Sequence, residues 1–287
     1  MENDLFALIS GNSTKFSKGQ HLIAQYIQNS YDKAAFMTAG KLGKTVGVSE
    51  STVVRFATEL GYDGYPDMRK ALQEMVRNRL TSVQRIQVAQ DVLDGSNVLK
   101  TVMSADIEKL KSTLDELDRK SFDAAVDAIV SAKNVYVVGM RSSSSLAEFL
   151  VFYLNLLMDN VHHVHDTDVS NVYEQIMRIG VGDLYIGLSF PRYTSTALNA
   201  MKFAKEKGAA TLALTDNPAS PFSTVADTLL YAKSDMVSFL DSLVAPMSLI
   251  NALIIAIGVR NPEALADKFS NLERIWGDYE VFTGNED

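Results

Sequence analysis

Two short segments rich in serine and threonine each follow a run of apolar residues and precede a helical pattern. One segment is residues 139–145 (GMRSSSS) and the other is residues 189–195 (SFPRYTS). Hydroxyl groups and free backbone N–H groups at the start of a helix bind anions, because the helix dipole favours negative charge there. Serine and threonine are also common helix caps, which is the alternative for either segment alone. Two such segments, one of them containing Arg192, favour a phosphorylated metabolite as the ligand.

Three histidines lie close together in residues 162–166 (HHVHD) and could bind a metal ion with the aspartate. On a β-strand, however, His163 and His165 share one face while His162 points to the other. The three rings cannot converge on one ion without a turn, so we expect no metal here. Two alternatives stay open for His163: it borders the ligand pocket at the end of its strand, or it is a half-buried strand histidine. We assign it to the pocket.

Glu148 and Glu174 follow the first two expected strands and could be general bases in an aldose–ketose isomerase. Nothing in their spacing distinguishes them from solvated glutamates on a helix face. We therefore assign no catalytic residue, and a phosphosugar isomerase is the alternative function.

Strands and helices must alternate over residues 121–260 to position these groups. The expected strands are apolar runs at residues 134–140, 161–164, 183–190, 210–215 and 228–232. The expected helices are at residues 142–158, 169–178, 195–207, 218–226 and 241–258. This alternation predicts a three-layer α/β domain with a parallel five-stranded sheet covered on both faces. Both serine-rich segments then follow the carboxyl ends of strands, where ligands bind in open α/β sheets.

Residues 17–80 instead show helical periodicity with almost no strand-like alternation. The expected helices are one that ends near residues 29–30 and others at residues 38–46, 50–60 and 67–80. Gly47 separates the second helix from the third, Ser49 stands at the N-cap position of the third, and residues 64–66 (GYP) form a turn. Two helices joined by a short turn with glycine are typical of a helix-turn-helix, whose second helix enters the major groove of DNA.

The third helix of this all-helical unit offers groups that suit DNA. Serine and threonine at its start suit phosphate oxygens, and Arg55 suits a phosphate or a guanine edge. Cations on neighbouring helices add phosphate contacts that weaken as salt rises. The alternative is that Ser49 only caps the helix and that the cations are ordinary solvated charges. The candidate DNA-binding residues are Lys41, Lys44, Ser49, Glu50, Ser51, Thr52, Arg55, Arg69 and Lys70.

Composition limits the classes of function. The net charge of −8 over 287 residues argues, as an average, against a nucleic-acid partner. Residues 1–80, however, hold ten Lys and Arg against eight Asp and Glu, so the acidity belongs to the remainder. The absence of cysteine excludes disulfides, Cys-ligated metal sites and a thiol nucleophile. The N-terminus shows no signal peptide and the apolar stretch at residues 243–259 is too short to span a membrane, so we expect a cytoplasmic protein with that stretch as a buried helix.

The segment GVSESTVVRFATELGYDGYPDMRKAL, residues 47–72, carries a resemblance to a known family. With it, residues 17–80 resemble the N-terminal domain of the RpiR family of bacterial transcription regulators. The resemblance implies that one set of residues faces DNA, namely Ser49, Ser51, Thr52 and Arg55. It implies that a second set holds the helix in place, namely Val53, Phe56 and Leu60. Gly43 stands where the family often has alanine, and we expect this difference to cost helix propensity and little else.

Residues 98–260 resemble one copy of the SIS (sugar isomerase) domain. The resemblance places residues 139, 142 and 143 on the first serine-containing loop of that family, and residues 189 and 194 on its second. In the second loop Pro191-Arg192 replaces the usual inner Ser-Gly pair, which weakens an isomerase analogy, although a guanidinium suits phosphate. The candidate effector-binding residues are Gly139, Arg141, Ser142, Ser143, His163, Ser189, Arg192 and Thr194.

The two resemblances together match the architecture of an RpiR regulator, which implies that the second domain senses a sugar phosphate without converting it. We expect a regulator of sugar or amino-sugar metabolism that binds double-stranded operator DNA, responds to a sugar-phosphate effector and uses no cofactor, metal or membrane. Because one helix-turn-helix reads half a site, we expect a homodimer or homotetramer. The expected domains are residues 1–80 for DNA binding, 81–97 as a linker, and 98–287 as the SIS domain with a C-terminal helix. A sugar-phosphate sensor that acts on a protein partner is a third possibility.

Overall fold

The computed structural model describes residues 5–77, 83, 85–86, 97–165, 169–235, 240–260 and 262–282. Its backbone divides into two compact units. The N-terminal unit contains residues 1–102 with 236–241, and the sheet unit contains residues 103–235 with 242–287. The predicted linker over residues 81–97 lies almost entirely outside the described residues, so the predicted domain boundaries stay a prediction.

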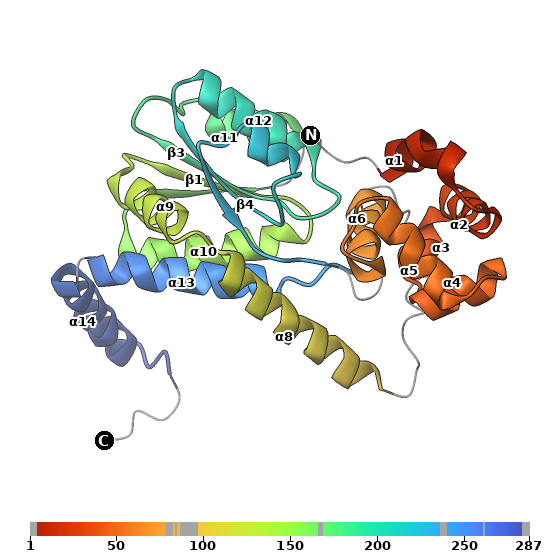
Figure 1. The fold of residues 1–287 in the computed structure, drawn as a ribbon. Coiled ribbons are helices and arrows are strands. Elements are labelled where there is room, and N and C mark those ends of the chain that lie inside the picture. Colours follow the sequence, from red (N-terminus) through yellow and green to blue (C-terminus); the bar gives the residue numbers. More distant parts are fainter. Residues whose placement is uncertain are drawn as a thin grey trace. The chain divides into compact units, whose positions relative to one another are not determined.

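The N-terminal unit is helical (Figure 1). Its elements are α1 (Leu5–Asn12), the 3₁₀ turn η1 (Ser13–Lys15), α2 (Lys18–Asn29), α3 (Tyr31–Ala34), α4 (Ala39–Val46), α5 (Glu50–Glu59) and α6 (Tyr65–Arg77). They enclose one apolar core, in which Ile23, Leu42, Phe56 and Met68 have no exposed surface. Burial of an apolar side chain of this size stabilises the fold by about 1.5–3 kcal/mol, so this core holds the helices together.

Two helix starts differ from the sequence expectations. The expected helical unit began at residue 17, but α1 precedes it and contributes Leu5 and Ile9, each 1% exposed, to the core. Residues 64–66 were expected to form a turn, but α6 already begins at Tyr65. Pro66 fits there because the first turn of a helix has no partner for its N–H and proline lacks one.

Gly43 allows α4 to approach the turn that leads into α5. A Cβ atom at Gly43 would lie 2.7 Å from the backbone oxygen of Val48, and the Val48 N–H donates to the Gly43 oxygen at 2.9 Å. The expectation that this glycine costs only helix propensity is therefore wrong. It is needed where two backbone segments meet.

The elements that follow residue 97 alternate as the sequence predicts. The helices are α8 (Val98–Glu116), α9 (Arg119–Ser131), α10 (Ser143–Leu157), α11 (Val169–Ile176), α12 (Ser195–Glu206), α13 (Val244–Arg260) and α14 (Pro262–Asp278). The strands are β1 (Val135–Gly139), β2 (Val161–Val164), β3 (Leu184–Leu188), β4 (Ala210–Thr215) and β5 (Thr228–Tyr231). All five strands are parallel and lie in the order β2-β1-β3-β4-β5. The expected parallel five-stranded sheet is thus confirmed.

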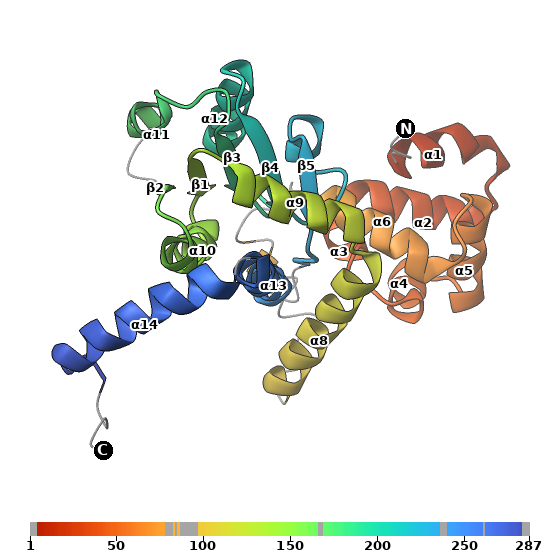
Figure 2. The same ribbon diagram turned by 90° about the vertical axis from the view of Figure 1, so that its left-hand side faces the viewer.

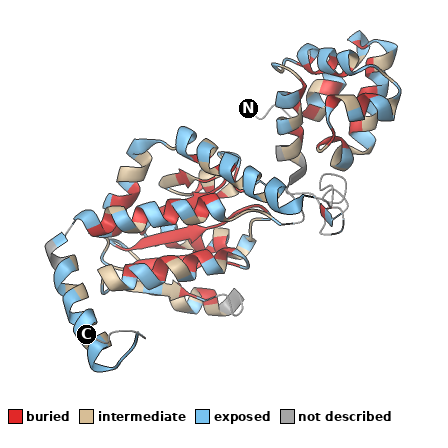
Figure 3. Ribbon diagram, turned by 90° about the horizontal axis from the view of Figure 1, so that it is seen from below, coloured by how far each residue is buried: buried red, intermediate tan, exposed pale blue. Residues whose placement is uncertain are grey.

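Helices cover both faces of this sheet (Figures 1 and 2). Residues of α9, α10 and α13 form one core with inward residues of the strands, and residues of α11 and α12 form the other. Figure 3 shows the central strands as buried, which matches β1 and β3, where every residue is buried. Because both faces are covered, these strands are continuous apolar runs.

The connection from β4 to β5 differs from the expectation. Residues 218–226 were expected to form a helix, but only the 3₁₀ turn η2 (Pro221–Thr224) forms there. Ser220 caps this turn by accepting the Phe222 N–H at 3.4 Å, and Phe222 is fully buried. Two prolines, Pro218 and Pro221, remove N–H donors that a longer helix would need.

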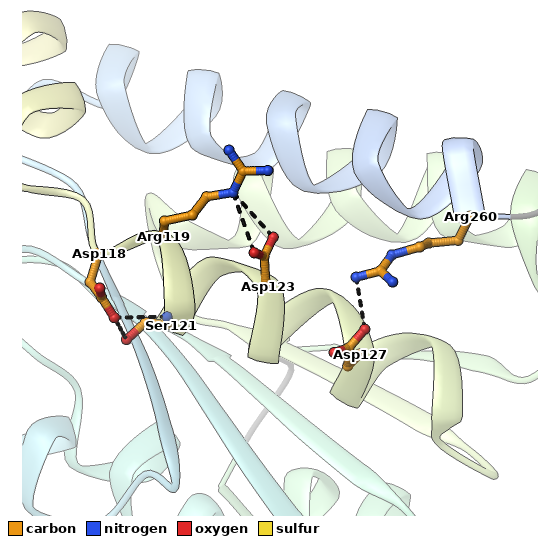
Figure 4. A network of polar contacts seen from close by, with 6 residues as sticks. All are labelled: Asp118, Arg119, Ser121, Asp123, Asp127 and Arg260. Carbon is orange, nitrogen blue, oxygen red and sulfur yellow. Dashed lines mark hydrogen bonds and ion pairs between the residues drawn. The ribbon is translucent and has the colours of Figure 1, made fainter.

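Polar contacts hold the start of α9 and join its outer side to the end of α13 (Figure 4). The Asp118 carboxylate accepts from the N–H and the hydroxyl of Ser121, both at 2.8 Å. The side-chain hydrogen bond to Ser121 is the main reason that the pKa of Asp118 is below its usual value. Arg260, in the last turn of α13, forms an ion pair with Asp127 at 2.8 Å. Asp118 therefore caps α9 as an N-cap residue should.

The apolar stretch at residues 243–259 forms most of α13, where Ile250 and Leu253 have no exposed surface. The expectation of a buried helix is confirmed. Over the part of the chain that the structure describes, no single helix has the length and apolar composition to cross a membrane. Among the described residues, one pair of helices, Val244–Arg260 and Leu265–Asp278, meets these criteria when taken together, and the two are bent by 105° relative to each other.

Candidate functional site

The predicted helix-turn-helix consists of α4, a left-handed glycine and α5. Gly47 ends α4 with φ 79° and ψ 33°, a conformation that glycine adopts without strain. The inward face of α5 carries Val53, Phe56 and Ala57, which have no exposed surface. The opposite face of α5 is exposed, as a recognition helix requires.

Four side chains form the exposed face of α5, namely Ser51, Val54, Arg55 and Thr58. The Arg55 Nε donates to the Ser51 backbone oxygen at 3.3 Å, and its guanidinium stays exposed. Val54 is 40% exposed and was not among the sequence candidates. An apolar side chain on a recognition helix suits the methyl group of thymine. The sequence offers no signal for Val54, because the identical residue beside it, Val53, belongs to the core.

The hydroxyl groups at the start of α5 bond to the helix and to one another. Ser49 Oγ accepts the Thr52 N–H at 3.3 Å and lies 2.9 Å from the Ser51 hydroxyl and 2.8 Å from that of Thr52. Thr52 is half-buried, with its methyl group against Gly19 of α2. Ser49 therefore caps α5, the alternative raised for it, while Ser49 and Ser51 both stay exposed.

Two acidic residues of α5 turn toward other helices. The Glu50 carboxylate lies over Gly40 of α4, where a Cβ atom would be 3.2 Å from Oε2. Glu59 Oε2 accepts a hydrogen bond from Gln20 Nε2 at 2.6 Å. Glu59 is still an exposed residue of α5. Its carboxylate is held against α2.

The candidate phosphate-binding cations differ in exposure. Lys41 and Lys44 on α4 and Lys70 on α6 are exposed, but Arg69 is half-buried. The Nε of Arg69 is enclosed and has no hydrogen-bond partner among the described residues. Burial raises the pKa of the neighbouring Tyr65 to about 12, against the opposing charge of Arg69. Arg69 thus lies beside the core, whereas the three lysines extend into solvent.

The first serine-rich loop leaves the sheet at the end of β1. A Cβ atom at Gly139 would lie 2.3 Å from the backbone oxygen of Ser143 and 2.9 Å from the Cβ of Ala147. Gly139 is therefore explained by the close approach of α10, with no ligand needed. Arg141 is exposed and has φ 56°, an uncommon conformation for a residue with a side chain.

The hydroxyl groups of this loop do not cap α10. Ser142 stands at the N-cap position, yet its side chain makes no capping hydrogen bond. Ser143 is 5% exposed, and Ser144 Oγ donates backward to the Arg141 oxygen at 2.6 Å. The alternative that these serines are simply helix caps therefore fails for Ser142.

The second loop repeats this arrangement at the end of the neighbouring strand β3. Thr194 is the N-cap residue of α12, but its side chain makes no capping hydrogen bond. Its Oγ1 is buried and has no hydrogen-bond partner among the described residues. Ser189 is 4% exposed, and Arg192 is exposed with φ 63°. Because Gly139 pairs with Leu188 in the parallel register, both loops start at the same edge of the sheet.

A buried carboxylate at the end of β4 was missed by the sequence reasoning. Asp216 is 1% exposed and accepts from the Tyr193 hydroxyl at 2.6 Å and from the Asn217 amide at 2.6 Å. Tyr193 belongs to the second loop, so this bond ties that loop to the next strand. The signal in the sequence was a polar run, TDN, directly after an apolar strand.

His163 lies on β2 in register with Val137 of β1, two residues before Gly139, where the first loop starts. Its ring centroid is 4.2 Å from that of His165, while the exposed His162 stacks on Tyr136 from the other side. Burial, and next the charge of His165, lower the pKa of His163, whereas Glu148 of α10 acts in the opposite direction. The described residues contain no group of three or more metal-ligating side chains. Glu174, the other candidate base, is an exposed residue of α11.

Two cavities lie away from these loops. A groove of about 430 Å³ is lined by apolar residues of α10, α13 and α14, among them Leu157, Ile254 and Phe269. A second cavity of about 400 Å³ is lined by residues of α1, η1 and α2 with Phe16. None of the sequence-predicted site residues lines either cavity.

Comparison with family models matches both parts of the chain. Residues 3–79 match the helix-turn-helix domain of the rpiR family, and residues 128–256 match the SIS domain. Among curated relatives, the HTH-type transcriptional regulator HexR of Pseudomonas aeruginosa is 26% identical over 267 residues, which is 90% of each chain. An HTH-type transcriptional regulator of Caldanaerobacter subterraneus is 22% identical over 261 residues, covering 88% of this chain and 90% of the relative.

Two solved structures are similar. The sugar isomerase domain of an RpiR transcription factor from Sphaerobacter thermophilus is 32% identical with a TM-score of 0.59, covering 62% of this chain and 99% of that one. The NanR protein of Vibrio vulnificus, solved with ManNAc-6P, is 22% identical with a TM-score of 0.56, covering 98% of this chain and 100% of that one. The relatives named as transcription regulators match over most of their length, which favours a regulator over the isomerase alternative.

Proposed function

The chain belongs to the RpiR family of helix-turn-helix transcription regulators, and from this premise we propose that a phosphorylated sugar, bound at the carboxyl edge of its sheet, controls its binding to operator DNA. One observation carries the effector part of this proposal. The Thr194 hydroxyl is buried without a hydrogen-bond partner among the described residues, at a helix start with no side-chain cap. A buried polar group in that position is costly unless a ligand satisfies it.

DNA recognition belongs to α5. Arg55 and Ser51 share its exposed face with Val54, so this face offers a guanidinium, a hydroxyl and an apolar contact to base edges and phosphates. The exposed lysines of α4 and α6, namely Lys41, Lys44 and Lys70, supply charge for the flanking phosphates of double-stranded DNA. Ser49 supports DNA binding by capping α5, and Thr52 and Glu50 support the start of the same helix. Arg69 approaches the phosphate backbone of the DNA from its position beside Tyr65.

Phosphate recognition belongs to the two loops. The starts of α10 and α12 lie at the same edge of the sheet, where a helix dipole favours an anion. Ser142, Ser189 and Thr194 offer hydroxyl donors, and Arg141 and Arg192 offer charge. His163, on the adjacent strand, contacts the sugar. The NanR protein was solved with a phosphorylated amino sugar, ManNAc-6P, and its similar fold supports this class of ligand.

The switch couples the two events through a pair of chains. One helix-turn-helix reads half a site, so two copies are needed for an operator with two-fold symmetry. An effector changes DNA affinity only if it binds one arrangement of the paired heads better than another. We place this regulator in the cytoplasm, where its DNA lies.

A crossed pair of variants tests the proposal. Arg55→Ala removes a guanidinium from the exposed face of α5, and we expect DNA affinity to fall by about 10- to 100-fold with effector affinity retained. Thr194→Val removes the unsatisfied hydroxyl with little change of volume, and we expect effector affinity to fall by about tenfold with DNA binding retained. The measurements are fluorescence anisotropy with the DNA upstream of the gene for this chain, and calorimetric titration with a panel of sugar phosphates.

Controls separate loss of function from loss of fold. Gln28→Ala, at an exposed position of α2 outside the recognition face, serves for DNA, and Thr224→Ala in η2 serves for the effector. Equal loss in both assays from either main variant contradicts the assignment of the two sites. Interconversion of an aldose and a ketose phosphate by the purified chain, without DNA binding at moderate salt, contradicts the proposed function.

A further inference from the structure

The first turn of α2 packs on one side of the recognition helix α5. A Cβ atom at Gly19 would lie 3.5 Å from the methyl group of Thr52, near the start of α5. Gln20 Nε2 donates at 2.6 Å to the carboxylate of Glu59, at the other end of α5. Thr52 and Glu59 are seven residues apart, so they share one side of a helix with 3.6 residues per turn. The beginning of α2 therefore contacts that side of α5.

Helix α4 packs on the opposite side of α5. The Glu50 carboxylate of α5 lies over Gly40 of α4. Glu50 and Thr52 are two residues apart, which separates their directions by about 160° around the helix axis. Arg55, on the exposed face, is only about 60° from Thr52. The exposed face of α5 is thus flanked by α4 on one side and by the start of α2 on the other.

The segment around the start of α2 carries positive charge and no acidic residue. Lys15, at the end of η1, and Lys18, at the beginning of α2, are both exposed. Residues 5–31 contain no Asp or Glu, although the whole chain holds 35 of them in 287 residues. Because no acidic side chain of this segment opposes them, the two lysines favour a negatively charged partner.

Buried contacts fix these two lysines beside α5. Phe16 lies between them in the sequence and is buried, with its ring centroid 5.1 Å from that of Phe56 of α5. Ser17 and Gln20 form a capping box, in which the Ser17 N–H donates to Gln20 Oε1 at 2.8 Å. Because Phe16 and the first turn of α2 are both held against α5, the lysines extend from a fixed segment.

We propose that Lys15 and Lys18 bind the phosphate backbone of the operator along one edge of the major groove, while the exposed lysines of α4 bind it along the other edge. The major groove of B-DNA is about 12 Å wide, so a helix inserted in it has a phosphate strand on each side. Two elements that flank α5 on opposite sides are placed to reach these two strands. This inference rests on the proposed function, because it extends the DNA-binding surface of α5 to a segment that precedes the helix-turn-helix.

The first experiment measures how the DNA affinity of the full chain depends on salt. Lys15→Gln with Lys18→Gln is titrated by fluorescence anisotropy with the DNA upstream of the gene for this chain and with a scrambled duplex. The slope of log affinity against log KCl concentration, from about 50 to about 200 mM, should decrease in magnitude by about 0.9 for each lost phosphate contact. Phosphate contacts carry no sequence information, so affinity should fall by a similar factor for both duplexes.

Two control variants separate a phosphate contact from a change of net charge. Lys202→Gln with Lys207→Gln removes two exposed lysines at α12 of the sheet unit and should leave the slope unchanged. Lys15→Arg with Lys18→Arg keeps both charges, and because a guanidinium also binds phosphate it should retain the original slope. Circular dichroism establishes that each variant folds.

The outcomes distinguish this inference from the proposed function. A folded Lys15→Gln, Lys18→Gln variant with the slope of the α12 control overturns the inference, and so does a loss of affinity confined to one duplex. In either case Arg55→Ala can still weaken DNA binding, and the proposed function stands. An unsubstituted chain that binds neither duplex contradicts the proposed function itself.

The second experiment uses the absence of cysteine from the chain, because a single introduced thiol can carry an iron chelate that cleaves nearby DNA backbone. Thr14→Cys is exposed, adjoins Lys15 and leaves both lysines in place. With ascorbate and peroxide, we expect cleavage at one edge of the bound major groove from Thr14→Cys and little from Lys202→Cys. Equal cleavage from both conjugates, or none from Thr14→Cys while the duplex stays bound, overturns the proposal.

Discussion

The helix starts of the two units use their hydroxyl groups differently. In the N-terminal unit Ser17, Thr38 and Ser49 each accept a backbone N–H at the start of a helix. At the carboxyl edge of the sheet, Ser142 and Thr194 hold the same position and make no such bond. The start of α9, which is not preceded by a strand, is capped by Asp118. Ser30, before the four-residue helix α3, makes no capping bond either. Among the helices of eight or more residues whose N-cap the structure describes, the uncapped starts are those of the two loops that leave the sheet.

This difference separates structural hydroxyls from hydroxyls that can bind a ligand. Every helix begins with four N–H groups that have no partner inside the helix. Where a side chain satisfies them, the residue contributes to stability and the start of the helix is closed to other acceptors. Where neither a side chain nor a backbone oxygen does so, the N–H groups remain able to bind an anion. At the start of α10 the N–H groups of Ser143 and Ser144 already donate to the Met140 and Arg141 oxygens, each at 3.1 Å. Recognition by the N-terminal unit must then come from outward side chains such as Arg55, and recognition by the sheet unit from its helix starts.

The largest expected effect comes from adding a methyl group where β1 and α10 are in close contact. Gly139→Ala places a methyl group 2.3 Å from the Ser143 oxygen, so α10 must move away from the sheet. We expect the sheet unit to lose about 3 kcal/mol or more, with effector binding abolished, because backbone and a packed helix must shift together.

Calorimetric unfolding measures this loss. Gly11→Ala is the matched control, because nothing lies within 4 Å of a Cβ atom there, and we expect unchanged or slightly higher stability. A normal unfolding temperature for Gly139→Ala would show that the loop does not depend on this close approach.

The comparison between the units is tested directly by two serine substitutions. Ser49→Ala removes a cap, and we expect the N-terminal unit to lose about 1 kcal/mol of stability. Ser142→Ala removes a hydroxyl that makes no capping bond, so we expect little change in stability and an effector affinity lower by about tenfold.

Denaturant unfolding and calorimetric titration measure both quantities for each variant. If Ser142→Ala destabilises the chain as much as Ser49→Ala does, the distinction between closed and open helix starts is wrong.

The smallest expected effect is the pH dependence that comes from His163. Because burial and then the charge of His165 lower its pKa in the folded chain, the unfolded chain binds the proton more readily. His163 therefore lowers the free energy of unfolding as the pH falls below the ordinary histidine pKa of about 6.5. Above that pH it has no such effect. We expect His163→Gln to reduce the loss of melting temperature on acidification.

Thermal unfolding at a series of pH values from about 8 to about 5 brackets the ordinary histidine pKa and measures this effect. His162→Gln is the control, since His162 is exposed and stacks on Tyr136 from the other side of the strand. An unchanged pH profile in His163→Gln would mean that the edge of the sheet imposes no cost on a protonated His163.

The sequence predicted those features that depend on local pattern. The apolar runs placed all five strands within about two residues, because strands buried on both faces are continuously apolar. Ser49 was recognised as a cap and Gly47 as the break between α4 and α5, because both follow from backbone geometry over a few residues. The groups proposed for effector binding were found because a polar loop after an apolar strand is a local signal.

Features that depend on distant residues were missed or misread. Gly43 was interpreted through helix propensity, but its need arises from the Val48 oxygen. The partial burial of Arg69 and the bond from Gln20 to Glu59 join different helices, so no spacing along the chain indicates them. On α8 the burial of Lys109 and Thr113 and the exposure of Leu114 likewise depend on packing against other segments.

By itself the sequence determined the order of helices and strands, the helix-turn-helix pattern and the two loops that follow β1 and β3. Tertiary structure decided which of their hydroxyl groups are already used. Propensity and periodicity act between neighbours in the chain, so residue types alone report them. Residue types alone do not report whether the Thr194 hydroxyl is buried without a hydrogen-bond partner among the described residues or whether Leu114 is exposed. Both depend on atoms from remote segments, which only packing brings together.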